Sequence, residues 1–128
     1  MLNQSGITKS TFGAPKQILA NVDLQSSVGC IVPQSLGVEV GAKKIAKAGT
    51  PVRIDLMNIN AAVAKADGTT AMNAVLLHDV DVTNGAANGT ALIFGFVNVN
   101  RVDADVATAI TTALTATGVS AKLTFMKV

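Results

Sequence analysis

Apolar and polar residues alternate in two short stretches of this chain. Residues 52–56 place Val52, Ile54 and Leu56 on one face, and residues 119–126 alternate in the same way. Successive side chains of a strand point to opposite faces, so this period predicts strands with one buried face. Both stretches are therefore expected to lie at the surface of a sheet.

Two longer apolar stretches predict strands in the middle of the chain. Residues 75–83 are apolar on both faces at first and partly polar later, as in a strand that enters the core at one end. Residues 90–99 are apolar on both faces, which is typical of a central strand, and Gly95 within them indicates a bulge or a close backbone approach. The segment Asn84–Gly89 is too long for a two-residue hairpin and predicts a projecting loop between the two strands.

One helix is predicted near the C-terminal end of the sequence. Three apolar residues recur at every fourth position: Val106, Ile110 and Leu114. They form one narrow stripe that a helix would bury. Either Asp103 or Asn100 is expected to cap its first turn, and Gly118 stands where a left-handed C-terminal cap is favoured.

These elements predict a mainly β domain of the α+β class. We expect a small barrel-like or sandwich-like core over residues 21–128, with one short C-terminal helix, because strand and helix do not alternate repeatedly. Residues 58–66 leave two interpretations open, a short Ala-rich helix or a loop. Lys43, Lys44 and Lys47 surround Ile45 and indicate a charged edge strand.

Residues 1–20 differ from the rest of the chain. Their apolar residues follow neither the strand nor the helix period: Leu2, Ile7, Phe12, Ile18 and Leu19. Gly6, Gly13 and Pro15 interrupt the stretch, which is typical of an extended arm outside the core. The alternative is an ordinary ragged terminus.

Composition favours an associating protein. Only 14% of the residues are charged and 49% are apolar, so a monomer would be poorly protected against association. Trp and Tyr are absent, and no basic stripe is interleaved with aromatic residues, so nucleic acid is not an expected partner. No apolar run reaches the length needed to cross a bilayer, so no membrane partner is expected.

The candidate chemistry is weak. Cys30, His78 and Asp79 are the residue types of a cysteine hydrolase, but neighbouring residues on a strand point apart, so Asp79 should not orient His78. Asp79 and Asp81 resemble the start of a calcium loop, yet Thr90 stands where that loop needs Glu. No phosphate-binding glycine loop is present. We therefore expect no catalytic residues, no cofactor and no metal site.

Three motifs resemble the small head-decoration proteins of tailed phages. They are AGTPV at residues 48–52, AVLLHDVDVT at 74–83 and LIFGFVN at 92–98, followed by a helix and a last strand. The similarity extends over residues 45–128, and a related family is the capsid-binding base of phage head fibres. This chain differs from the lambda-type proteins in lacking tryptophan and in its longer, Gly- and Pro-interrupted N-terminus.

The resemblance implies a structural virion protein without enzymatic activity. Such a protein is made in the bacterial host cytoplasm and binds the major capsid protein on the outer capsid surface as a homotrimer, stabilising the shell. The resemblance also implies that the arm clamps capsid subunits, through Leu2, Ile7, Thr8, Phe12, Pro15 and Ile18. The alternatives are a subunit or base of a fibre or adhesin, and a small Cys/His hydrolase.

Overall fold

The computed structural model describes residues 17–21, 23–119 and 121–127, and every structural statement below concerns these residues. Nine strands, two 3₁₀ turns and one α-helix follow one another along this part of the chain. In order they are β1 Ser26–Val32, η2 Gln34–Leu36, β2 Val38–Val40, β3 Lys43–Ala46, β4 Pro51–Arg53, β5 Ala64–Lys65, β6 Ala74–Leu76, β7 Val80–Asp81, β8 Ala87–Asn98, η3 Val99–Arg101, α1 Ala104–Ala113 and β9 Lys122–Met126.

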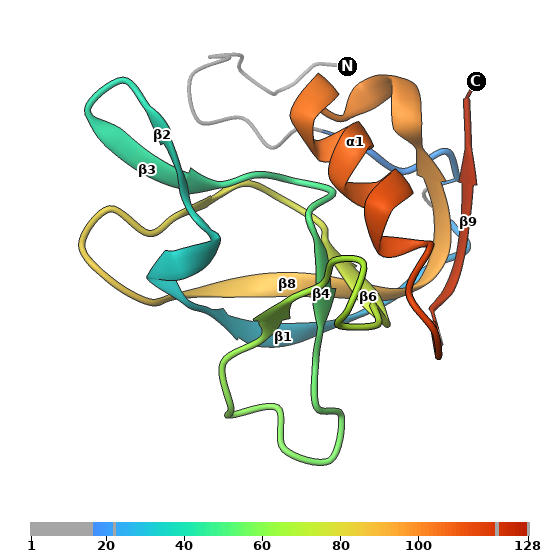
Figure 1. The fold of residues 1–128 in the computed structure, drawn as a ribbon, viewed down its shortest axis with the longest axis horizontal. Helices are drawn as coiled ribbons and strands as arrows, with labels where there is room; N and C mark the ends of the chain where they lie inside the picture. Colours follow the sequence, from blue (N-terminus) through green and yellow to red (C-terminus); the bar gives the residue numbers. More distant parts are fainter. Residues whose placement is uncertain (1–16, 22, 120, 128) are drawn as a thin grey trace.

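The described strands form two sheets (Figure 1), and the long strand β8 pairs with three strands of the larger one. The larger sheet has the order β1-β8-β6-β4-β5, and β9 pairs with β8 in parallel. The smaller sheet has the order β2-β3-β7. The mainly β fold with one helix near the C-terminal end is confirmed, and the sheets do not close into a barrel.

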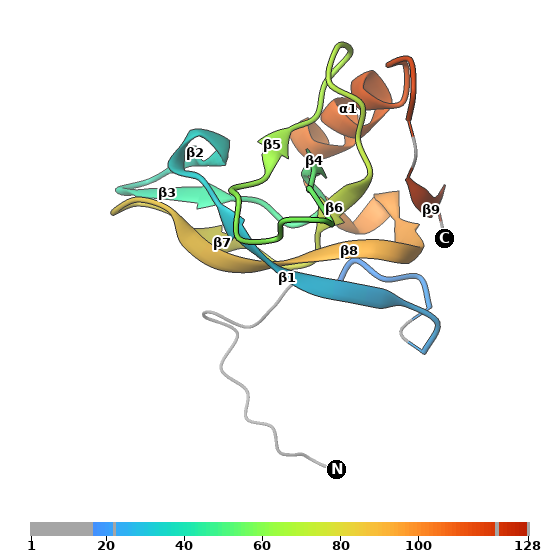
Figure 2. The same cartoon turned by 90° about the horizontal axis from the view of Figure 1, so that it is seen from below.

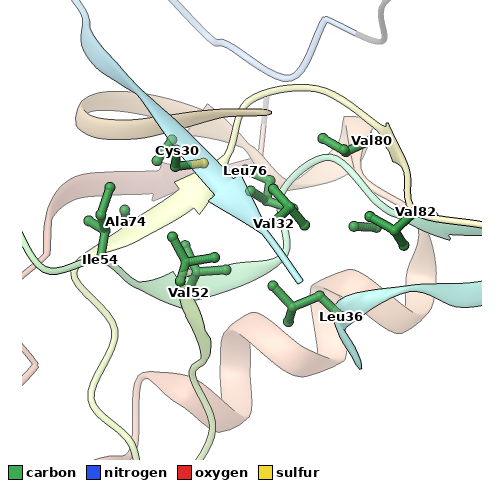
Figure 3. Close-up of a cluster of buried hydrophobic side chains, with 12 residues drawn as sticks. Cys30, Val32, Leu36, Val52, Ile54, Ala74, Leu76, Val80 and Val82 are labelled. Atoms are coloured by element: carbon green, nitrogen blue, oxygen red, sulfur yellow. The ribbon is translucent and has the colours of Figure 1, made fainter. Parts of the chain in front are cut away.

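Two apolar clusters fill the interior of the described domain. The first core lies between β1, β4, β6 and the smaller sheet, as Figure 3 shows, and includes Cys30, Val32, Val52, Leu76 and Val82. The second core lies between β8, β9 and α1. Its buried residues are Ile18, Leu19, Ala48, Ala66, Met72, Val75, Leu77, Leu92, Val97 and Ala113.

The predicted strand over residues 75–83 is wrong as a single element. The chain bends at Leu77 and His78, so β6 joins the larger sheet and β7 joins the smaller one. The Leu77 N–H donates to the Thr90 carbonyl, which keeps the bend against β8. The projecting loop is also shorter than predicted, because β8 already begins at Ala87.

The predicted strand over residues 52–56 ends early, at Arg53. The Asn73 side chain accepts a hydrogen bond from the Ile54 N–H and donates one to the Ile54 carbonyl, both at 2.8 Å. A side chain therefore takes the place of the next strand partner, and Leu56 is exposed rather than buried. The ambiguous residues 58–66 form a loop and the short strand β5, without a helix.

Helix α1 follows the predicted pattern over its first two turns. Val106 and Ile110 are buried, and Gly118 has the left-handed φ of 86° expected of a cap residue. Leu114 is 46% exposed, however, because the helix ends at Ala113 and turns of the tighter i+3 type follow, which direct Ala116 inward instead. Asp103 occupies the N-cap position as predicted, but its side chain makes no capping hydrogen bond and pairs with Lys47 at 3.2 Å.

The lysine-rich strand is not at an edge. β3 lies in the middle of the smaller sheet, between β2 and β7. Lys47, just after β3, lies within 3.2 Å of the Asp103 and Asp105 carboxylates at the start of α1. The hydrogen bond to Asp105 is the main reason why the pKa of Lys47 lies above its ordinary value. The ion pairs of Lys47 therefore link the start of α1 to the end of β3.

Candidate functional site

The chain enters the described structure beside the C-terminal end of β8. The Asn98 N–H donates to the Ile18 carbonyl at 2.8 Å, and the Ala20 N–H donates to the Phe96 carbonyl at 2.9 Å. Leu19 pairs with Val97 between these two bonds. Figure 2 shows this segment and β9 at the same end of β8. We call residues 18–20 the arm root.

The arm root corrects one part of the predicted arm. Ile18 is 0% exposed and Leu19 is also buried, both in the second core, so Ile18 packs into the domain rather than lying on an arm outside the core. Two consecutive buried residues match neither the strand nor the helix period, which explains why the sequence pattern missed them. The remaining predicted arm residues lie outside the described residues: Leu2, Ile7, Thr8, Phe12 and Pro15.

One exposed apolar surface lies on the outer side of β8 and β9. Leu123 and Phe125 pack on the second core, so the alternate residues of β9 face away from it. Phe94 pairs with Lys122, Phe96 with Thr124 and Asn98 with Met126. We call the surface formed by Phe94, Phe96, Lys122, Thr124 and Met126 the β8–β9 face, which is mostly apolar with one charged residue at its far end. Phe94 is 40% exposed and Met126 is 38% exposed.

A second exposed apolar group lies in the loop between β4 and β5. This loop projects away from both sheets (green, at the bottom of Figure 1), and Met57 at its tip is 95% exposed beside the exposed Leu56 and Ile59. The loop has regular turns, because the Asp55 carboxylate accepts from the Met57 N–H at 3.0 Å and the Asp55 carbonyl accepts from the Asn58 N–H at 3.0 Å. Large exposed apolar groups of this kind mark interaction surfaces.

The three hydrolase-type residues do not form one site. Cys30 lines a hollow of about 400 Å³ with Ile31 and Ile59, whereas His78 and Asp79 line a different hollow of about 300 Å³. Burial raises the pKa of the Cys30 thiol, which disfavours the reactive thiolate.

The expected reason for separating His78 from Asp79 was wrong. Both lie in the bend after β6, not on a strand, and Asp79 accepts a hydrogen bond from the Ala48 N–H at 2.7 Å. The buried Nδ1 of His78 has no hydrogen-bond partner among the described residues.

The carboxylates of Asp67 and Asp81 stabilise local turns and do not form a shared ligand-binding site. Asp81 accepts from the Thr83 hydroxyl at 2.6 Å and from the Thr83 N–H at 3.0 Å, which lowers the pKa of its carboxyl group. Asp67 accepts from the N–H groups of Thr70 and Thr69, both at 2.8 Å, with the same effect on its pKa. No group of three His, Cys, Asp or Glu side chains that could hold a metal occurs among the described residues.

The depressed pKa values of Asp67 and Asp81 predict a loss of stability in acid. Their contribution is complete above the ordinary carboxyl value of 3.8 and disappears as the pH falls through the lower folded-state value. Asp67→Asn and Asp81→Asn should therefore unfold at lower urea concentration than the wild type near pH 7, with a gap that narrows as the pH falls below 3.8. Asp23→Asn, at an exposed position before β1, is the control and should show no such gap.

Within the described part of the chain, no helix has the length and apolar character needed to span a membrane. Comparison with models of known protein families and with curated proteins gives no match to this chain.

Proposed function

We propose that this chain is a structural, non-catalytic protein of a phage head that binds the outer capsid surface as a trimer and stabilises the shell. The observation that carries the proposal is the arm root, where Ile18 and Leu19 are buried and bonded to β8. Residues 1–16 precede a fixed point on the domain. They include the large apolar side chains of Leu2, Ile7 and Phe12.

Strand addition is the mode of binding that suits such an arm. An extended segment supplies main-chain hydrogen bonds to an open sheet edge of the capsid protein, and alternate side chains fill pockets beside that edge. Three arms on one trimer bind the same capsid together. Once one arm is bound, the others act at high effective concentration, which raises the total affinity by about 10²–10⁴-fold.

The free protein is expected to be a trimer. Few charges and the exposed group Leu56, Met57 and Ile59 favour association. Light scattering at micromolar concentration should give about three times the 13.0-kDa chain mass. Met57→Glu should weaken association by roughly tenfold or more, since burial of one large apolar side chain contributes about 1.5–3 kcal/mol. Glu39→Gln, on β2, is the control. A wild-type protein with the mass of a single chain would contradict the trimer.

Co-sedimentation with expanded phage heads that lack their decoration protein tests the proposal directly. The protein should pellet with these heads at a fixed ratio to the capsid protein. It should not pellet with heads already saturated with their own decoration protein. If it stays in the supernatant at saturating concentrations of bare heads, the capsid proposal fails.

A further inference from the structure

The β8–β9 face is an apolar surface that no described element covers. Phe94 and Met126 are both more than a third exposed, and neither Phe94 nor Phe96 belongs to either apolar core. Phenylalanine has the largest apolar side chain in this sequence, so two phenylalanines on an open sheet face indicate a surface that is covered by an occupant.

The arm root leads to this same face. At Val97, β8 has Leu19 on one edge and Phe125 on the other, so three chain segments lie side by side. Neighbouring strands are about 4.8 Å apart, which places the arm root about 10 Å from β9. The preceding residues therefore leave the domain at one end of the β8–β9 face.

The length of the arm matches the length of the face. From the Asn98–Met126 pair to the Phe94–Lys122 pair the face extends four residues, or about 13 Å. Phe12 stands five residues before Gln17, a distance that an extended chain covers in about 17 Å. The arm root runs antiparallel to β8 and leaves it beyond Asn98, so the preceding residues have to turn back to lie over the face. After such a turn Phe12 reaches the near end of the face at Met126, and Ile7 reaches its far end at Phe94.

Tethering decides which occupant is favoured. A segment joined to the face by a few residues acts at an effective concentration of roughly millimolar, whereas a second copy of the chain acts at its own micromolar concentration. We propose that residues 1–16 of the same chain pack over the β8–β9 face, with Phe12 against Met126 and Ile7 against Phe94. The inference concerns the free protein, whose arm would leave this face when it pairs with a capsid strand, and so stands independently of the proposed function.

The direct test is a nuclear Overhauser measurement on the full-length protein. Contacts between the Phe12 ring and the Met126 methyl group are expected. Isotope-filtered spectra of a mixture of isotope-labelled and unlabelled protein should show that these contacts arise within one chain. Contacts only between copies would identify a second copy as the occupant and overturn the proposal, as would the absence of any contact to Phe12.

Trypsin supplies a second readout, because Lys9 lies within the arm. Cleavage after Lys9 in the full-length protein should be about tenfold slower than in a free peptide of residues 2–15, since it follows the population of the released arm. Phe94→Ser and Met126→Ser should each remove most of this protection. Val38→Ser, at a similarly exposed position on β2, should leave it unchanged.

A double variant separates the contact from a general loss of stability. Phe12→Ser should also speed cleavage, and Phe12→Ser combined with Met126→Ser should be no faster than either change alone, because both remove the same contact. Thermal unfolding of each variant verifies that the domain is folded. Wild-type cleavage as fast as that of the peptide, or additive effects of the two changes, would overturn the inference. Failure to bind heads would not affect it.

Discussion

Deletion of residues 2–16 is expected to abolish co-sedimentation with bare phage heads. The deletion removes Leu2, Ile7 and Phe12, the side chains that would fill pockets beside a capsid strand, and it removes the main chain that would pair with that strand. Because three arms act together on one trimer, the apparent affinity should fall by about 10²-fold or more. The second core should stay closed, since its first residue, Ile18, is retained.

A substitution at Ile18, just after the deleted segment, is the control for this prediction. Ile18→Ala in the full-length chain should instead lower the free energy of unfolding by about 2–5 kcal/mol, because a fully buried side chain is truncated. Its folded fraction should still bind heads. A chain lacking residues 2–16 that decorates heads with wild-type affinity would show that the arm is only a terminal extension.

Gly49→Ala should lower the free energy of unfolding more than either Gly41→Ala or Gly29→Ala. Gly49 has φ of 90°, and its N–H donates to the Leu76 carbonyl at 2.7 Å. An added Cβ would lie 2.6 Å from one methyl group of Val102 and 3.1 Å from one of Val106. Left-handed strain of about 1–2 kcal/mol and overpacking of about 1–3 kcal/mol should together lower the free energy of unfolding by about 2–5 kcal/mol.

Two other glycines provide matched controls for Gly49. Gly41 also has a positive φ, 63°, but an added Cβ would meet open space, so Gly41→Ala should show the backbone strain alone. Gly29 has neither constraint, so Gly29→Ala should be nearly neutral. Urea unfolding of the three variants gives the comparison. Equal losses at Gly49 and Gly41 would show that contact with the start of α1 contributes nothing.

The elements with long, regular patterns could be predicted from the sequence. α1 and β9 each have enough residues to show their period, β8 is one long apolar run, and all three were located within a few positions. The break between β6 and β7 could not be predicted. Its apolar residues continue through Leu77, and only the hydrogen bond to Thr90, from a distant strand, shows why the chain bends there. The same holds for Leu56, where the side chain of Asn73 ends the ladder.

The candidate site was only partly accessible to sequence reasoning. The irregular N-terminal pattern indicated an arm, but its boundary depends on contacts of Ile18 and Leu19 with β8, far along the sequence. The sequence pattern did not reveal the β8–β9 face, because β8 contains a bulge. Ser26 pairs with Phe94 and Ser27 with Leu92, so Ile93 is an extra residue and the alternation changes face there. A strict period of two therefore gave the impression of a strand buried on both sides.

The pairing of Val97 with both Leu19 and Phe125 also bears on how the chain folds. The buried residues of the first core all lie between positions 30 and 91, whereas the second core needs segments from both ends of the described chain. Contacts between distant segments require the closure of long loops, so they form late. The second core is expected to close last during folding and to open first in native-state hydrogen exchange, which makes the arm root the least stable part of the central sheet.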